Sequence, residues 1–305
     1  MHPTIAKLIS SRPVLTDGAW GSNRLVITDG AWGTQLQKRG MPVGSIPDAL
    51  NLTQPDIVED VARAYVEAGS QVILTNTFGA NRFILGRHKL GDKVAEINRR
   101  GVEISKKAAG SKAKVFASIG PSGVMLLMGD VSREELQTAF AEQAKVQADA
   151  GADGIVVETM SDLDEARLAV VAAVETGLPV VACMTFDSGA NKDRTMMGVT
   201  PEQAAEKLTD AGADVIGSNC GQGIAEYVAI CRRLHAATNR PIWIKPNAGL
   251  PKLVDGKTEY TQTAEEFASF VPQLIEAGAS FIGGCCGTSP EYIKVVRNAV
   301  TASKV

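Results

Sequence analysis

Histidine is scarce in this chain of 305 residues, which contains only three, His2, His88 and His235. None of the three follows an apolar run of the kind that forms a buried strand. Hydrolytic zinc sites held by histidine and Ser-His-Asp acyl transfer both require a well-placed imidazole. The sequence therefore disfavours both kinds of chemistry.

An excess of charge of one sign is also lacking, since 31 Lys and Arg face 34 Asp and Glu and give a net charge of −3. Without a basic stripe we expect no nucleic-acid partner. No apolar run approaches the ~20 residues that span a bilayer, and residues 1–12 lack the apolar core of a signal peptide. We therefore expect no membrane partner and a cytoplasmic location, where the five cysteines would stay reduced.

A short motif of an acidic residue, Ala, Gly and a small residue recurs four times, each time before a β-rich run. The copies begin at Glu67, Asp149, Asp210 and Glu276. In each copy the glycine stands where a helix ends with a positive φ. The motif therefore predicts a helix followed directly by a strand.

Eight strands and eight helices alternate along the predicted chain. The strands are continuous apolar runs, which is typical of parallel strands buried on both faces. They are expected at 25–28, 72–75, 115–119, 154–158, 180–185, 215–219, 242–245 and 281–284. The helices are expected at 57–68, 93–109, 133–150, 163–175, 201–211, 224–237, 263–277 and 290–300. Eight such pairs predict a single α/β domain, a (β/α)₈ TIM barrel with parallel strands.

The segment Asp-Gly-Ala-Trp-Gly occurs twice, beginning at Asp17 and at Asp29. Only one copy can follow the first barrel strand. We assign the second copy, because a helix-like segment over 34–39 continues from it. We therefore expect residues 1–24 to be an extension, in which the first copy is either a β-hairpin plug over the barrel floor or a duplication without a role. Residues 25–305 would form the barrel.

Three cysteines stand at strand ends: Cys220 after the sixth strand, and Cys285 and Cys286 after the eighth. Because the carboxyl ends of barrel strands meet at one mouth, we expect these thiols to converge. Alone, the vicinal pair could equally be two buried thiols or a strained disulfide. A third thiol at the same mouth favours a Cys₃ zinc site with an open fourth position. Cys183, within a strand, and Cys231, within a helix, are interpreted as core residues.

Three thiolates leave zinc with a net charge of about −1, which makes it a poor Lewis acid for a carbonyl. Such a metal would instead lower the pKa of an incoming thiol and keep its sulfur nucleophilic. The catalytic and metal-binding residues are therefore predicted to be Cys220, Cys285 and Cys286. The reaction they indicate is attack by a substrate thiolate on an alkyl donor.

The polar residues at the other strand ends predict how such a substrate is held. Asp29 and Glu158 would bind an ammonium group, unless Asp29 caps a helix and Glu158 pairs with a barrel Lys or Arg. The amides of Gly30 and Ala31, or those of 120–123, would take a carboxylate. Asn247 would fill the open zinc position without substrate, or be an ordinary loop amide. Asn76 and Thr77 complete the predicted site. An amino acid with a thiol side chain satisfies all of these groups.

The sequence resembles the zinc-dependent homocysteine S-methyltransferases over about residues 25–300. The resemblance lies in segments 29–34, 75–78, 158–162, 219–220, 245–251 and 283–288, of which Gly-Gly-Cys-Cys-Gly is the most specific. It is most similar to the homocysteine-binding barrel of cobalamin-dependent methionine synthases, with betaine and S-methylmethionine enzymes as cousins. The resemblance implies zinc on Cys220, Cys285 and Cys286. It also implies homocysteine bound to zinc through its sulfur, its ammonium on Asp29 and Glu158, and methionine as product.

The methyl donor is open at this point, because no folate or corrinoid site is evident in the sequence. The donor is a small onium compound, or a methyl-corrinoid or methyltetrahydrofolate system on a separate partner protein. Trp32, Phe78 and Tyr260 would give an onium group an aromatic wall, or would pack the core. The competing interpretations are a different thiol acceptor, or a zinc and amino-acid binding module without catalysis.

Overall fold

The structure is a computed structural model that describes residues 1–10, 25–42, 44–254 and 257–302. The first copy of the duplicated segment, at 16–21, lies outside these ranges. The second copy follows the first barrel strand, as expected. The extent of the N-terminal extension stays a prediction.

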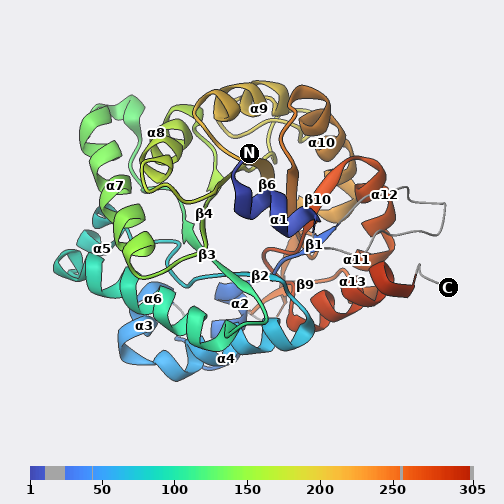
Figure 1. Cartoon of the computed structure of the whole chain (residues 1–305), viewed down its shortest axis with the longest axis horizontal. Coiled ribbons are helices and arrows are strands. Elements are labelled where there is room, and N and C mark those ends of the chain that lie inside the picture. Colours follow the sequence, from blue (N-terminus) through green and yellow to red (C-terminus); the bar gives the residue numbers. More distant parts are fainter. Residues whose placement is uncertain (11–24, 43, 255–256, 303–305) are drawn as a thin grey trace.

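Eight parallel strands form the barrel, in the order β1, β10, β7, β6, β5, β4, β3, β2. A parallel bridge between Thr28 and Val72 joins the two end strands and closes the ring (Figure 1). The predicted (β/α)₈ fold and all eight predicted strands are confirmed. The strands are β1 (Val26–Ile27), β2 (Val72–Leu74), β3 (Lys114–Ile119), β4 (Gly154–Met160), β5 (Val180–Met184), β6 (Val215–Gly223), β7 (Ile242–Asn247) and β10 (Ala279–Ile282).

Helices surround the strands on all sides in Figure 1. They are α2 (Trp32–Lys38), α3 (Leu50–Thr53), α4 (Pro55–Ala68), α5 (Arg82–Arg87), α6 (Val94–Ala109), α7 (Arg133–Asp149), α8 (Leu163–Val174), α9 (Pro201–Asp210), α10 (Ile224–Ala237), α11 (Ala264–Ser269), α12 (Val271–Glu276) and α13 (Pro290–Ala302). The predicted helix 263–277 is in fact two helices. Pro272 explains the break, because proline lacks the amide that would continue the hydrogen-bond ladder.

The recurring Ala-Gly motif ends its helices as predicted. Gly69, Gly151, Gly212 and Gly278 all have φ between 90° and 105°. Each motif places the chain at the start of β2, β4, β6 or β10. Among the described residues, no helix is both long and apolar enough to cross a membrane.

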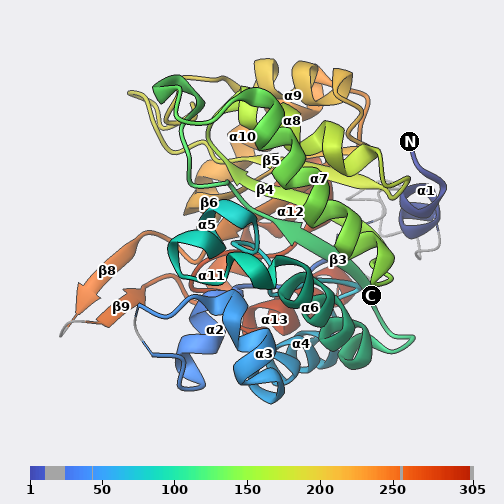
Figure 2. The same ribbon diagram turned by 90° about the vertical axis from the view of Figure 1, so that its left-hand side faces the viewer.

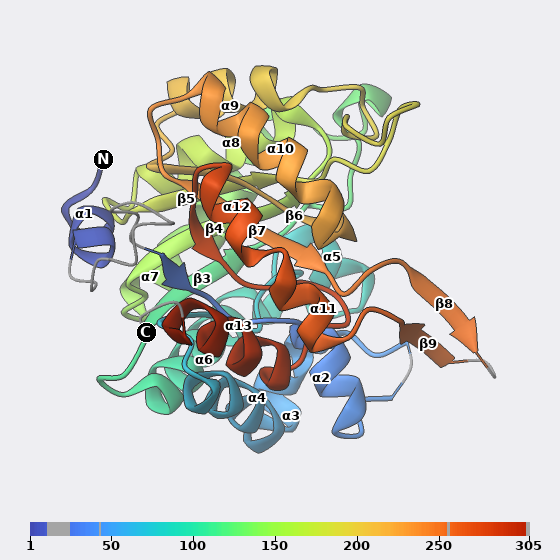
Figure 3. The same ribbon diagram turned by 90° about the vertical axis from the view of Figure 1, so that its right-hand side faces the viewer.

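Among the elements that were not predicted, helix α1 (Pro3–Ser10) and the hairpin of β8 (Pro251–Val254) and β9 (Lys257–Tyr260) lie at opposite ends of the barrel. Helix α1 lies at the end where the strands begin, and the hairpin projects from the other end (Figures 2 and 3). Short turns η1 (Pro47–Ala49), η2 (Gly91–Lys93) and η3 (Leu126–Met128) lie in loops. The hairpin marks the mouth at which the functional residues gather.

Large apolar side chains fill the barrel interior, so that the barrel is a packed core. Trp243 lies between Phe116 and Phe281, with ring centroids 6.3 Å and 5.0 Å away. Ile5 and Leu8 of α1 belong to the same cluster and cover the floor. Burial of these rings on the floor side leaves the opposite end of the barrel open for a site.

The two cysteines interpreted as core residues are buried, as expected. Cys183 lies in the interior cluster with Trp243, and Cys231 lies in the cluster between helices and sheet. Burial raises the pKa of Cys183 and raises the pKa of Cys231 to about 12, against the smaller opposing effects of Lys245 and Arg232. Both therefore act as small apolar side chains.

Candidate active site

The three cysteines predicted from the sequence converge at the mouth of the barrel. Cys220 lies near the end of β6, and Cys285 and Cys286 follow β10. Their Sγ atoms all lie within 4.8 Å of one another. Among the residues that the structure describes, this is the one group of His, Cys, Asp or Glu side chains close enough to hold a metal ion.

Backbone hydrogen bonds hold the two cysteine-bearing loops in place. The Cys285 amide donates to the Pro246 carbonyl at 2.7 Å, and the Ala248 amide donates to the Cys286 carbonyl at 2.9 Å. Gly283 lets the end of β10 lie close to the end of β1, because a Cβ there would lie 2.0 Å from Oγ1 of Thr28. The loops after β7 and β10 are thus fixed to each other before any ligand binds.

The three thiols share their protons unequally. Hydrogen bonds from the Cys285 and Cys286 thiols lower the pKa of Cys220 to about 3. Their bonds to Cys220 raise the pKa of Cys285 and raise the pKa of Cys286 to about 11. Three converging cysteine sulfurs, of which Cys220 ionises most readily, are a donor set that suits a soft or borderline cation.

Asn247 lies against this cluster. Its side-chain amide donates to the Gly221 carbonyl at 3.2 Å, and its hydrogen bond to Cys220 helps to lower the pKa of that thiol. Its Oδ1 atom is buried without a hydrogen-bond partner. A buried acceptor without a partner next to three thiols is what a missing cation would satisfy.

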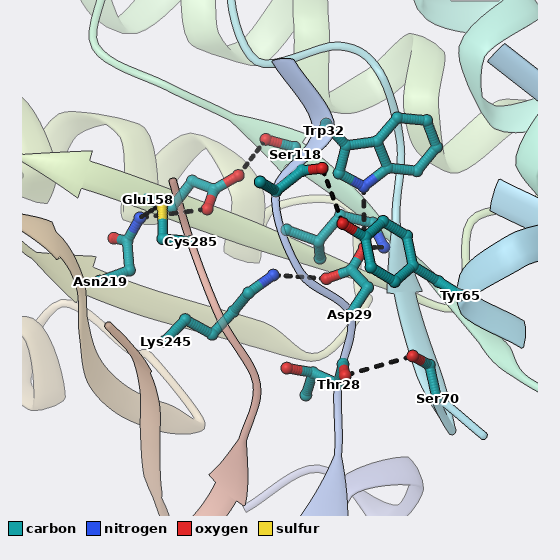
Figure 4. Close-up of polar contacts among 12 residues, drawn as sticks. Thr28, Asp29, Trp32, Tyr65, Ser70, Ser118, Glu158, Asn219, Lys245 and Cys285 are labelled. Atoms are coloured by element: carbon teal, nitrogen blue, oxygen red, sulfur yellow. Dashed lines mark hydrogen bonds and ion pairs between the residues drawn. The ribbon is translucent and has the colours of Figure 1, made fainter. Parts of the chain in front are cut away.

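Asp29, expected to bind the substrate ammonium, is completely buried and bonded to protein donors (Figure 4). Its Oδ1 accepts from Nζ of Lys245. Its Oδ2 accepts from Nε1 of Trp32 at 2.8 Å and from the Leu74 amide at 2.7 Å. The direct contact of Asp29 with substrate stays a prediction, but Lys245 already holds the oxygen that it would use.

Glu158 lies at the end of β4 and has no ion-pair partner within 4 Å among the described residues. Its Oε1 accepts from Oγ of Ser118 at 2.5 Å, and its Oε2 accepts from Asn219 at 3.3 Å. Burial raises the pKa of Glu158, while the charge of Lys245 and the Ser118 bond oppose that rise. This carboxylate can therefore still gain from a cation.

A cavity of about 370 Å³ opens over these groups. Of the predicted site residues, those that line it are Gly30, Asn76, Glu158, Cys220, Cys285 and Cys286. Asp29, Thr77 and Asn247 do not line it. Thr77 is buried and donates to the Ser118 carbonyl at 2.8 Å, so its hydroxyl supports the strands.

The two candidate sites for the substrate carboxylate differ in whether their backbone amides are free to donate. The Gly120 amide donates to the Phe78 carbonyl at 2.9 Å and the Ser122 amide donates to Glu165 at 2.7 Å, so the loop 120–123 has already used these donors. Gly30 and Ala31 line the cavity, although the Ala31 amide donates to Oγ1 of Thr288 at 3.1 Å. The Gly30 turn is thus the better placed of the two.

Only two of the three aromatic residues suggested for an onium donor line the cavity. Trp32 and Phe78 line the cavity, and Phe78 is 41% exposed. Tyr260 lies outside the lining, and its hydroxyl interacts with Cys286. Of the three aromatic residues, Trp32 and Phe78 are therefore the two that border the cavity.

Sequence reasoning missed three residues of this cavity, Ser118, Lys245 and Asp48. A signal existed for Lys245, a single charge in an apolar strand immediately before a proline. Asp48 lies in η1, is 3% exposed, and accepts from the Gly79 amide at 2.9 Å. Burial raises the pKa of Asp48 from 3.8 to about 7, against the opposing effect of backbone amides.

This raised pKa predicts a pH dependence of stability. Between its unfolded pKa of 3.8 and its folded pKa of about 7, Asp48 binds a proton only in the native state. Stability is therefore lost as pH rises through this window, by about 4 kcal/mol in total. We expect Asp48→Asn to remove this loss, which urea unfolding of both proteins at about pH 4 and about pH 8 would show. Parallel pH profiles would contradict the prediction.

Comparison with known proteins identifies the family of the chain. A family model described as homocysteine S-methyltransferase matches residues 26–300. The methionine synthases of Mycobacterium leprae and Mycobacterium tuberculosis are 33% and 34% identical to the chain over 97% of its length. The chain spans 25% of the length of each of these relatives.

Solved structures support the fold. The metallated form of the homocysteine methyltransferase MmuM from Escherichia coli superposes with a TM-score of 0.75 at 22% identity, covering 90% of this chain and 95% of that one. At that identity the likeness concerns the barrel architecture. The match over residues 26–300, together with the two methionine synthases, shows that the chain belongs to the homocysteine S-methyltransferase family.

Proposed function

We propose that this protein transfers a methyl group to the thiol of homocysteine and so produces methionine, with Zn²⁺ held by Cys220, Cys285 and Cys286. The observation that carries the proposal is the convergence of three Sγ atoms within 4.8 Å at the edge of a cavity that also contains Glu158. The names of the methionine synthase relatives and the family model support homocysteine as acceptor and methionine as product.

The donor set fits zinc. Three thiolates are a ligand set that a catalytic zinc site with an open fourth position accepts, and the buried Asn247 Oδ1 would fill that position only in the absence of substrate. When bound, the metal would lower the pKa of an incoming thiol and keep its sulfur electron-rich. With an onium donor, the thiol and the methyl onium compound react to give a methyl thioether, the demethylated donor and a proton.

The protein's own residues would place the acceptor. The Glu158 carboxylate would pair with the α-ammonium group, and the Gly30 turn would face the carboxylate. Asn76 lines the cavity but gives its amide to the Pro47 carbonyl at 2.7 Å, so its contribution is to hold the loop of η1 against β2. Trp32 and Phe78 would border the space left for the donor.

Two donor classes remain in the proposal. A small onium compound of the betaine or S-methylmethionine type would fit a cavity of about 370 Å³ with an aromatic wall. A methyl-corrinoid or methyltetrahydrofolate system would require a partner protein that carries the group to the mouth.

The decisive assay mixes zinc-loaded protein and homocysteine with betaine, S-methylmethionine, S-adenosylmethionine or methylcobalamin, one at a time. We expect methionine to form with one of these donors. If methionine forms with none while zinc and homocysteine bind tightly, the small-donor class fails, and the chain is either a binding module or an enzyme whose donor is carried by a partner protein. Methylation of another thiol in preference to homocysteine would overturn the choice of acceptor.

A further inference from the structure

Lys245 is a buried lysine whose charge faces the acceptor side of the cavity. Its side chain is 2% exposed and lies in β7. Its ammonium group bonds to Asp29, and Figure 4 shows it pointing across the barrel mouth toward that carboxylate. A lysine buried to this extent is costly unless it is paired.

The charges in this part of the site can be counted. Asp29 and Lys245 form an ion pair in which both side chains are almost fully buried. Glu158 also interacts with the charge of Lys245 but has no cation of its own within 4 Å among the described side chains. The three groups together leave one negative charge. One substrate ammonium would therefore bring the cluster to neutrality.

Asp29 has little capacity left for a second cation. One of its oxygens accepts from Lys245, and the other accepts from Trp32 and from the Leu74 amide. A substrate ammonium could reach Asp29 only by displacing Lys245. The displaced lysine would then have Glu158 as its one available carboxylate among the described residues of this region. Such an exchange would leave the total number of ion pairs unchanged.

We propose that Lys245 determines the specificity of the acceptor site: its ammonium permanently occupies Asp29, so that the site binds a single substrate ammonium, and binds it at Glu158. This inference rests on the proposed function, since it concerns how that site selects its acceptor. It changes the role of Asp29 from a substrate ligand to the residue that holds Lys245 away from Glu158.

A direct consequence concerns Asp29→Asn. The substitution releases Lys245, whose charge also interacts with Glu158. Pairing of Lys245 with Glu158 would neutralise the carboxylate that the substrate needs. The loss of homocysteine binding would then be reversed by also removing the lysine, because Asp29→Asn combined with Lys245→Met leaves Glu158 as an unpaired anion.

The experiment measures discrimination between homocysteine and γ-mercaptobutyrate, which is homocysteine without its ammonium group. Affinities come from calorimetry on the zinc-loaded protein and from the thiolate-to-metal absorption band of the cobalt-substituted protein. We expect wild type to prefer homocysteine by about a hundredfold, as for a buried charge pair. Asp29→Asn should lose most of this preference, and the double variant should recover it to within about fivefold.

The ratio of the affinities of the two ligands for one variant does not depend on the fraction of that variant that is folded. Lys145→Met is the matched control, because Lys145 is 73% exposed on α7 and should leave the ratio unchanged. A double variant that stays as poor as Asp29→Asn would overturn the role of Lys245 and show direct binding to Asp29. If wild type itself does not discriminate, both this inference and homocysteine as acceptor fail. If wild type discriminates but the double variant does not recover, only this inference fails.

Discussion

Replacing Cys285 by serine is expected to weaken zinc binding by about two orders of magnitude and to reduce methyl transfer to homocysteine at least as far. A serine hydroxyl is not ionised at neutral pH and is a harder ligand than a thiolate. Four-ligand zinc sites are worth roughly 10–16 kcal/mol, so each ligand accounts for about 3 kcal/mol and its loss weakens zinc affinity by about two orders of magnitude. Turnover should fall at least as far, because in the proposed function the same metal activates the acceptor thiol.

The measurements are zinc content after gel filtration, zinc affinity by competition with a chromophoric chelator, and methionine formation. Cys231→Ser is the matched control, because Cys231 is a buried thiol in α10 far from the cluster in the fold. It should keep full zinc occupancy. Wild type treated with a chelator should lose homocysteine binding in the same way. Turnover that survives in Cys285→Ser would refute the Cys₃ assignment.

The barrel could be predicted because the signals that specify its helices and strands lie in short segments of the sequence. Each Ala-Gly motif combines a helix end with a required positive φ, and the strands that follow are apolar along their whole length. Helix α1 was missed because its eight residues are too few for a clear periodic pattern, and its role depends on Ile5 and Leu8 meeting an interior built from distant strands.

The cysteine cluster could be predicted for a related reason. Once the strands are placed, the barrel topology brings Cys220 and Cys285 to one mouth. The Asp29 to Lys245 ion pair could not be foreseen in this way. It joins residues that are 216 positions apart, and which carboxylate a buried lysine chooses depends on side-chain geometry. Asp48 was missed because it lies in an irregular segment whose burial follows from packing.

The largest effect expected on substrate binding is that of Glu158→Gln. The glutamine keeps the acceptor for Ser118 but has no charge for the substrate ammonium. We expect the KM for homocysteine to rise by about a hundredfold, the usual consequence of removing one member of a desolvated charge pair. The kcat should change less, because the ammonium is remote from the reacting sulfur. The affinity of γ-mercaptobutyrate, which lacks the ammonium, should be almost unchanged.

A pH profile separates this electrostatic role from a merely structural one. The pKa of Glu158 is raised by burial above its ordinary value of 4.5, and only the ionised form can pair with an ammonium group. Homocysteine affinity in wild type should therefore be present above that raised pKa and be lost as pH falls through it. In Glu158→Gln this loss of affinity at low pH should be absent, because no titrating group remains at that position. If Glu158→Gln binds homocysteine weakly but still loses affinity at low pH as wild type does, the titrating group is a different carboxylate of the cavity. The substrate ammonium would then bind elsewhere.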